Sequence, residues 1–341
     1  MSLRTTASLV GAALILPLTL AACGTTDPGA AASSAPAEAA SGDCADVTTE
    51  TGPVSVTDSF GRTVELDEPA ERVAVLEWQQ TEDLLTLCVN PVAVADVEGY
   101  STWDSAEELP DGVTDVGTRG EPNLDALYAT EPDLVVIEAY TPDDEIIAQL
   151  EAYDVPVLAT KGADAADPIK NMFTTFDLIA QATGRTERAA TVTEEFEQHL
   201  ADAEAAISEA APEHTDFVYF DGWIDGGNVT LRPFGQGSLI GELGEEIGLT
   251  NAWTGEVDPA YGLGQSDIEG MTAAGDATLL YTGTPDPDGD WTTELEKNDV
   301  WANLPAVTED RSHAFPERIW TFGGPRSALQ VVDAYVDVFT K

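Results

Sequence analysis

The chain has 341 residues, enough for two ordinary domains, and 43% of them are hydrophobic, as in a typical globular protein. It carries 63 acidic residues against 14 Lys and Arg, which gives a formal net charge of −49. This excess of negative charge argues against a nucleic-acid-binding surface and against adhesion to anionic lipid, and we interpret it as a source of solubility.

The first segment has the pattern of an export signal. Arg4 precedes an apolar run over residues 7–22, which ends in small residues before Cys23. The stretch LAAC at residues 20–23 resembles the lipobox of bacterial lipoproteins, in which the cysteine is lipidated and becomes the new N-terminus. A signal peptide with a chance cysteine is the alternative. We expect a signal peptide over residues 1–23 and a protein anchored outside the cell membrane only by the lipid (palmitate) on Cys23.

A flexible tether is predicted over residues 24–52, which are small and polar and include prolines. Cys44 and Cys88 are the two remaining cysteines. Export places them in an oxidising compartment, so we expect a disulfide that fixes the tether to the domain, with two reduced buried thiols as the alternative. No metal site is predicted, because the sequence has no CxxC motif and its histidines are scattered.

From residue 53 the sequence alternates between short strands and helices. Residues 54–58 and 63–66 predict a hairpin. Further strands are predicted over 72–76, 91–95, 113–117, 134–137 and 155–159, with helices over 81–87, 123–130 and 145–153. This alternation predicts an N-terminal α/β lobe of residues 53–185, with a parallel sheet covered on both faces.

Residues 186–210 predict a long helix, because Val192, Phe196 and Leu200 have helical spacing in a stretch rich in Ala and Glu. A second α/β lobe follows over residues 211–341, with strands over 217–220 and 278–281 and helices over 238–247, 268–274 and 328–339. The fold class is therefore α/β, with two Rossmann-like lobes joined by a single long α-helix. The carboxyl ends of the strands are expected to face a cleft between the lobes.

Scarce cations and aromatic residues occur just after the predicted strands. Arginine binds carboxylate, hydroxamate or catecholate oxygens, and aromatic faces cover apolar ligand edges. For each residue the alternative is a lid over the core or a structural ion pair. The glycine-rich loop 232–241 is either an anion site at a helix start or a turn. The predicted ligand-binding residues are Trp78, Tyr100, Trp103, Arg119, Tyr140, Lys161, Trp223, Arg232, Trp320 and Arg326.

Several blocks of sequence are similar to the iron-siderophore substrate-binding lipoproteins of ABC importers, the class III periplasmic-binding-like family. These blocks are residues 57–66 with 69–75, 116–127 with 131–136, 299–307, and 320–325. The resemblance extends over about residues 54–340 and implies two lobes about a rigid helix. It also implies docking on a permease dimer through one acidic residue per lobe, at Asp125 and Glu269. The family usually has Glu at the first position, and a plain solvated carboxylate is the alternative for both.

We therefore expect a monomeric protein, not an enzyme, that binds an anionic ferric siderophore and delivers it to an ABC permease. No cofactor is expected, since iron enters only within the siderophore. A haem- or cobalamin-type binding protein of the same family is an alternative. A further alternative is an exported enzyme that uses Glu77, Glu138 or Asp221 as an acid/base pair, although P-loop, HExxH and nucleophile-elbow motifs are absent from the sequence.

Overall fold

The computed structural model describes residues 44–284 and 290–341. The predicted signal peptide, Cys23 and residues 24–43 of the predicted tether lie outside the described residues. Within the part of the chain that the structure describes, no helix has the length and apolar character needed to cross a membrane.

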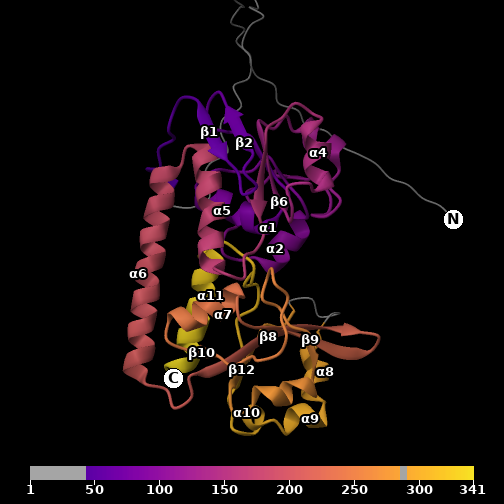
Figure 1. Cartoon of the computed structure of the whole chain (residues 1–341), viewed down its shortest axis with the longest axis vertical. Coiled ribbons are helices and arrows are strands. Elements are labelled where there is room, and N and C mark those ends of the chain that lie inside the picture. Colours follow the sequence, from indigo (N-terminus) through magenta and orange to yellow (C-terminus); the bar gives the residue numbers. More distant parts are fainter. Residues whose placement is uncertain (1–43, 285–289) are drawn as a thin grey trace, which may run out of the picture. The chain divides into compact units, whose positions relative to one another are not determined.

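The N-terminal lobe is built on a five-stranded parallel sheet in the order β5-β4-β3-β6-β7 (Figure 1). Along β6, Leu134 and Val136 pack into one hydrophobic cluster, whereas Val135 and Ile137 pack into another. Both faces are thus buried, which explains the unbroken apolar runs in the sequence. The elements are β1 (Val54–Thr57), β2 (Thr63–Leu66), β3 (Val73–Val75), α1 (Trp78–Thr86), β4 (Ala93–Val94), α2 (Val97–Trp103), β5 (Thr114–Asp115), α3 (Leu124–Ala129), β6 (Leu134–Ala139), α4 (Glu145–Glu151), β7 (Val157–Lys161) and α5 (Pro168–Thr183).

The C-terminal lobe has a mixed sheet in the order β11-β9-β8-β12-β13, with β10 paired to β8. Its strands are β8 (Asp216–Asp225), β9 (Asn228–Phe234), β10 (Thr250–Asn251), β11 (Ser266–Asp267), β12 (Thr278–Tyr281) and β13 (Ser312–Ala314). Its helices are α7 (Leu239–Glu246), the 3-10 helix η2 (Gly270–Ala274), α8 (Thr292–Glu296), α9 (Asp299–Ala302), α10 (Pro305–Thr308) and α11 (Pro325–Phe339). The antiparallel β8–β9 hairpin extends past the rest of the sheet (Figure 1).

Helix α6 (Thr186–Ala210) joins the two lobes and has the bounds that the sequence predicted. Its 25 residues span about 38 Å at 1.5 Å per residue. Ala189 and Val192 pack into an N-lobe cluster, whereas Phe196, Ala203 and Ile207 pack into the C-lobe cluster with α11. One uninterrupted helix therefore belongs to both cores.

Several helical segments differ from the predictions: α2, α5, α8, α9 and α10 were not predicted, and α1 and the segment 268–274 differ in start or type. Helix α5, which packs on β1, α1 and α6, was not predicted at all. Helix α1 begins at Trp78 rather than at a Thr81 cap, because the Glu77 side chain accepts a hydrogen bond from the Trp78 backbone N–H. The helix predicted over 268–274 is the shorter 3-10 helix η2.

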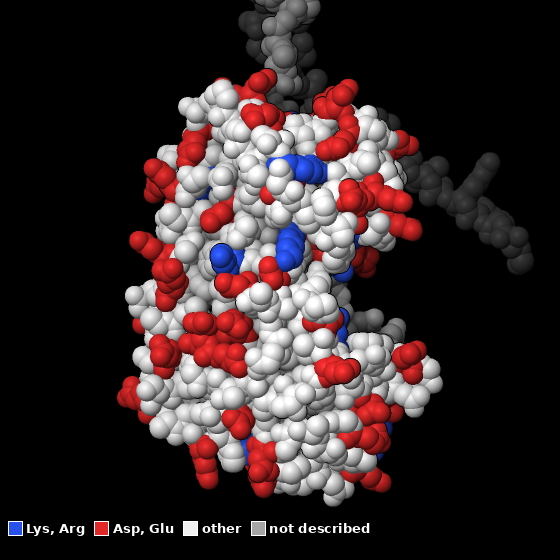
Figure 2. All heavy atoms as spheres, viewed as in Figure 1, with Lys and Arg blue, Asp and Glu red and all other residues white. Residues whose placement is uncertain are grey.

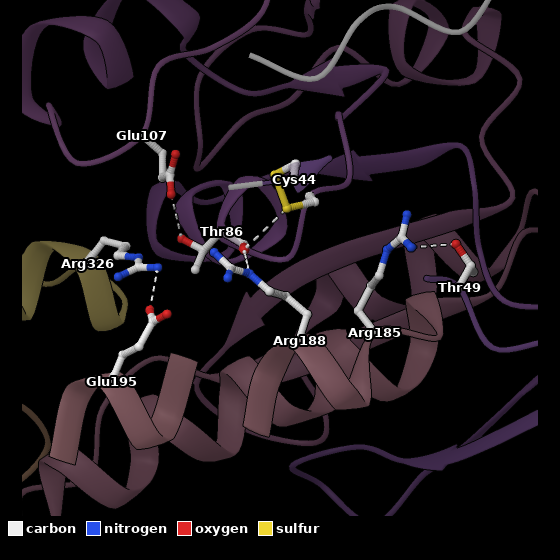
Figure 3. Close-up of a disulfide and its surroundings, with 9 residues drawn as sticks. Cys44, Thr49, Thr86, Glu107, Arg185, Arg188, Glu195 and Arg326 are labelled. Atoms are coloured by element: carbon white, nitrogen blue, oxygen red, sulfur yellow. Dashed lines mark hydrogen bonds and ion pairs between the residues drawn. A yellow bond between two sulfur atoms is a disulfide. The ribbon is translucent and has the colours of Figure 1, made fainter. Parts of the chain in front are cut away.

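A disulfide joins Cys44 to Cys88, as predicted, at the C-terminal end of α1 (Figure 3). The segment after Cys44 is attached further along, where Glu50 N donates to Gly184 O at 2.9 Å and Arg185 donates to Thr49 Oγ1. Arg188 of α6 donates to Thr86 O beside the disulfide, at 3.1 Å. The predicted tether is therefore held against the N-lobe from Cys44 onward.

Replacing both cysteines by alanine should lower the free energy of unfolding by about 2–4 kcal/mol, because the bond closes a long loop in the unfolded chain. The sequence separation is 44 residues. Urea unfolding with and without reductant measures the effect, and the alanine variant serves as the control because it must not respond to reductant. A reductant-insensitive wild-type midpoint would contradict the prediction.

A buried carboxylate also links the lobes. Glu82 of α1 accepts hydrogen bonds from the first turn of α11: Gly324 N and Arg326 N at 3.0 Å, Ser327 N at 2.9 Å and Ser327 Oγ at 2.6 Å. These N–H groups are the free donors at the start of a helix, whose dipole favours a negative charge. Glu82 thus caps a C-lobe helix from the N-lobe.

Two further carboxyl groups, those of Asp83 and Asp104, are buried beside Glu82. Burial raises the pKa of all three, and repulsion from Glu82 adds to the effect on both aspartates. The pKa of Asp104 rises from 3.8 to about 9, so its carboxyl is protonated at neutral pH and hydrogen-bonds to Glu82. The capping hydrogen bonds from Ser327 and Gly324 oppose the rise in the pKa of Glu82.

The same contact explains the two glycines of the block at residues 320–325. A Cβ atom on Gly324 would lie 2.1 Å from Asp83 Oδ1, and one on Gly323 would lie 2.6 Å from Glu82 Oε2. Any side chain at either position would push the start of α11 away from α1. The glycines are therefore required by the close approach of the two lobes.

Candidate functional site

A cavity of about 500 Å³ lies between the lobes and is lined by residues at the carboxyl ends of strands from both. Figure 2 shows a notch between the lobes at the right-hand edge of this face, with blue side chains at its rim, whereas most of the other charged side chains on this face are red. Seven of the ten residues predicted to bind the ligand line this cavity: Trp78, Trp103, Arg119, Tyr140, Trp223, Arg232 and Trp320. These residues were predicted because ligands bind beyond the carboxyl ends of strands, and at that place the structure has a cavity.

The other three predicted residues lie outside the cavity lining. Tyr100 is buried in α2 and donates to Glu107 O at 2.8 Å. Lys161 is the last residue of β7, and its Nζ donates to Asp164 at 2.7 Å. Arg326 lies in the first turn of α11 and binds Glu195 of α6 at 2.9 Å (Figure 3). Their side chains are used in structural contacts.

Arg119 forms one side of the cavity from the loop after β5. Its Nη1 lies 2.5 Å from Glu77 Oε1. Its guanidinium carbon lies 3.8 Å from the centre of the Trp78 ring and 5.5 Å from that of Trp320. The cation is therefore held by one carboxylate and packed against the faces of two indoles.

Arg232 lies on the opposite lobe, in β9. Its Nε and Nη2 donate to the two oxygens of Asp221 at 2.9 Å and 2.5 Å, as a bidentate pair across the β8–β9 hairpin. Phe322 and Trp223 lie 5.3 Å and 5.9 Å from the guanidinium carbon. Burial raises the pKa of Asp221, and the hydrogen bonds from Arg232 oppose this shift.

A hydrogen bond crosses the cavity between the lobes. Tyr261 Oη, from the C-lobe, donates to Glu138 Oε1 of β6 at 2.8 Å. Burial raises the pKa of Glu138, and the charge of Glu77 raises it further, whereas the hydrogen bonds from Tyr261 and Tyr140 lower it. A Cβ atom on Gly162 would lie 2.2 Å from Glu138 Cδ, so this position must be glycine for the bond to form.

Sequence reasoning did not include Tyr261, Leu263 or Phe322 among the ligand-binding residues, although all three line the cavity. Tyr261 and Leu263 lie in the long loop between β10 and β11, which offers no periodic pattern. Phe322 lies two residues after Trp320, within the block of residues 320–325 that resembles the siderophore-binding family. Aromatic residues within glycine-rich loops were the feature of the sequence that could have indicated Tyr261 and Phe322 as cavity residues.

The two predicted docking residues lie one on each lobe. Asp125 is exposed in the first turn of α3, and Glu269 is exposed at the start of η2. Both carboxylates are accessible, so their positions allow contact with another protein. Their role stays a prediction.

Across residues 44–284 and 290–341, no three His, Cys, Asp or Glu side chains are grouped so as to hold a metal ion. The carboxylates considered for an acid/base pair are each engaged separately: Glu77 with Arg119, Asp221 with Arg232 and Glu138 with Tyr261. Nothing in this arrangement favours the enzyme alternative.

Residues 73–318 match the model of a family described as periplasmic binding protein. The chain belongs to this periplasmic binding protein family. The match includes α6 and most of each lobe, so the expected α/β fold with two lobes and one connecting helix is confirmed.

Relatives within the periplasmic binding protein family include proteins named for iron chelates. The iron(3+)-hydroxamate-binding protein FhuD of Escherichia coli (strain K12) is 30% identical over 269 residues, which cover 76% of this chain and 84% of that protein. The Fe(3+)-citrate-binding protein YfmC of Bacillus subtilis (strain 168) is 26% identical over 80% of this chain and 81% of that protein. The crystal structure of FhuD from Vibrio cholerae bound to Fe3+-Desferal has a TM-score of 0.69 and 22% identity, and it covers 79% of this chain and 98% of that chain.

Proposed function

We propose that this protein is an extracytoplasmic binding protein that captures a ferric siderophore and delivers it to the permease of an ABC importer. The observation that carries the proposal is the cavity between the lobes, lined by four tryptophans and two arginines, in a chain 30% identical to an iron(3+)-hydroxamate-binding protein. Membership of a binding-protein family supports binding and release of the ligand rather than chemistry on it.

The lining suits a chelate that already fills the coordination sphere of its iron. Among the described residues that line the cavity there is no His, Cys or Met. Of the usual haem ligands only tyrosine is present, as Tyr140, Tyr219 and Tyr261. Tyr140 and Tyr261 are hydrogen-bonded to Glu138, and Tyr219 donates to Thr282. No observation favours a haem or cobalamin ligand. The indoles would cover the apolar backbone of the siderophore, and the guanidinium N–H groups would donate to its oxygen atoms.

Delivery requires attachment to the membrane and contact with a permease. The lipobox-like sequence supports a lipid anchor on Cys23, and the disulfide at Cys44 would fix the point at which the tether leaves the N-lobe. Exposed Asp125 and Glu269, one on each lobe, support docking of the monomer on a permease dimer through one acidic residue per lobe.

Titration of the tryptophan fluorescence with a ferric trihydroxamate tests the proposal, because Trp78, Trp103, Trp223 and Trp320 all line the cavity. We expect quenching by the ferric complex and a weaker response to the iron-free chelator. Arg119→Ala should weaken binding by about 1.5–3 kcal/mol, since it removes a charged donor. The matched control is Arg72→Ala, an exposed arginine at the start of β3 and outside the cavity lining, which should leave the affinity unchanged. If no ferric chelate quenches the fluorescence, the proposed ligand is wrong.

A further inference from the structure

The charges around the cavity do not favour an anion. Among its described lining residues are two guanidinium groups, Arg119 and Arg232, and three carboxyl groups, Glu77, Glu138 and Asp221, with no lysine. The formal charge of the lining is therefore not positive, whichever protonation state Glu138 adopts. The prediction of an anionic chelate rested on the arginines, and the sequence analysis considered these three carboxylates only as a possible acid/base pair.

Each guanidinium group is already engaged by a carboxylate. Asp221 uses both oxygens on Arg232, and Glu77 lies 2.5 Å from Arg119. A negatively charged ligand would have to displace a carboxylate or lie beside one, and like charges at that separation repel strongly in a partly dry site. A ligand that offers neutral acceptor oxygens can instead use the remaining guanidinium N–H groups with both ion pairs intact.

A second cavity, of about 920 Å³, adjoins the first and shares Glu77, Arg119, Glu138 and Tyr140 with it. It is formed by the N-lobe alone, and its lining adds four carboxylates to the shared ones: Asp96, Glu121, Asp144 and Glu145. The carboxylates of Asp96 and Asp144 accept hydrogen bonds from backbone N–H groups, whereas Glu121 and Glu145 are exposed. A ligand held between the lobes thus has a strongly negative space beside it.

We propose, on the basis of the siderophore-binding function above, that the ligand is a ferric chelate without net negative charge, and that the N-lobe side cavity accommodates a positively charged substituent of it. A ferric trihydroxamate meets this description, because three singly charged hydroxamates neutralise the ferric ion. A ferric tris-catecholate or a ferric citrate complex keeps negative charge and does not. Family membership alone does not decide this point, since relatives named for a hydroxamate and for a citrate chelate both occur.

The first experiment compares four probes by fluorescence titration: ferric Desferal, a linear trihydroxamate with one free amine; the same complex with the amine acetylated; a ferric tris-catecholate; and ferric citrate. We expect both trihydroxamates to bind about tenfold or more tightly than the two anionic complexes. The complex with the free amine should bind about two- to fivefold more tightly than its acetylated form at low salt. This advantage should vanish when ionic strength rises from about 0.01 M to about 1 M, which shortens the Debye length from about 30 Å to about 3 Å.

The second experiment releases the guanidinium of Arg232. Asp221→Asn removes its carboxylate partner, so the affinity ratio of the tris-catecholate to the acetylated trihydroxamate should rise about tenfold. Asp225→Asn, at an exposed position of the same hairpin, is the matched control and should leave the ratio unchanged. Retained binding of the acetylated trihydroxamate shows that the variant is folded. If it is not folded, Glu77→Gln makes the same test at Arg119.

The outcomes separate this inference from the function on which it rests. Binding of the tris-catecholate or citrate complex as tight as that of the trihydroxamates overturns the charge assignment while leaving siderophore binding in place. Equal affinity of the two trihydroxamates at low salt overturns the role of the side cavity. If no ferric chelate binds, the siderophore-binding function itself fails, and the charge assignment fails with it.

Discussion

Replacing Glu82 by alanine is expected to lower the free energy of unfolding by about 3–5 kcal/mol, the largest loss we expect from any single change. The carboxylate accepts four hydrogen bonds from Gly324, Arg326 and Ser327 at the start of α11, all within a buried contact between the lobes. Alanine would leave buried donors without an acceptor, at a cost of about 1–3 kcal/mol for each group that stays dry.

Urea unfolding of wild type and variant measures this loss. Glu197→Ala is the matched control, because Glu197 is exposed on α6 and its replacement should change stability by less than about 0.5 kcal/mol. A loss below about 1 kcal/mol for Glu82→Ala would show that the cap on α11 does not hold the lobes together.

Asp104→Asn should raise the stability of the protein relative to wild type, by an amount that grows with pH. The folded protein keeps a proton on Asp104 up to a pKa of about 9, whereas the unfolded chain releases it near the usual value of 3.8. Between these pH values the folded state binds one proton more than the unfolded state. The contribution of Asp104 to stability therefore falls as pH rises, by up to about 1.4 kcal/mol per pH unit.

Asparagine imitates the neutral acid, because its amide can donate to Glu82 and its oxygen can still accept from Ala106 N, which lies 2.8 Å from Asp104 Oδ1. Chemical unfolding at a series of pH values from 4 to 9 should give similar stabilities at the acidic end and a growing advantage for the variant above it. Asp111→Asn, at an exposed aspartate, should show no such trend. A difference that is independent of pH would mean that Asp104 is ionised in the folded state.

Much of the fold followed from local pattern. The strands β3, β6 and β7 are buried on both faces, so their continuous apolar runs could be recognised as strands from the sequence. Asn123 and Ser238 cap α3 and α7, as their side-chain chemistry suggests. Helix α5 was missed even though Asp167, Pro168 and Gly184 mark its ends. Its exposed residues Lys170, Thr174, Asp177 and Gln181 recur at helical spacing, so the polar face of α5 was also present in the sequence.

The position of the cavity could be predicted from the sequence, but the net charge of its lining could not. Strand ends indicated where the cavity lies, because parallel strands place their carboxyl ends at one edge. The partners of the arginines depend on pairing between strands: Asp221 faces Arg232 only because the hairpin turns at Gly226 and Gly227, both with positive φ. The stretch DGGN at residues 225–228 is a hairpin signal, and applying its register would have paired these residues from sequence.

The uninterrupted helix α6 limits how much the shape of the protein can change when the ligand binds. Since the two halves of this helix are embedded in separate cores, swinging one lobe away from the other must bend a continuous ladder of backbone hydrogen bonds, which resists sharp angles. Helix α6 therefore allows little opening or closing of the two lobes about a hinge. A permease would therefore distinguish the ligand-bound protein from the ligand-free protein mainly by contact with the bound ligand at the opening of the cavity. The small-angle scattering curves of the two forms should nearly superimpose.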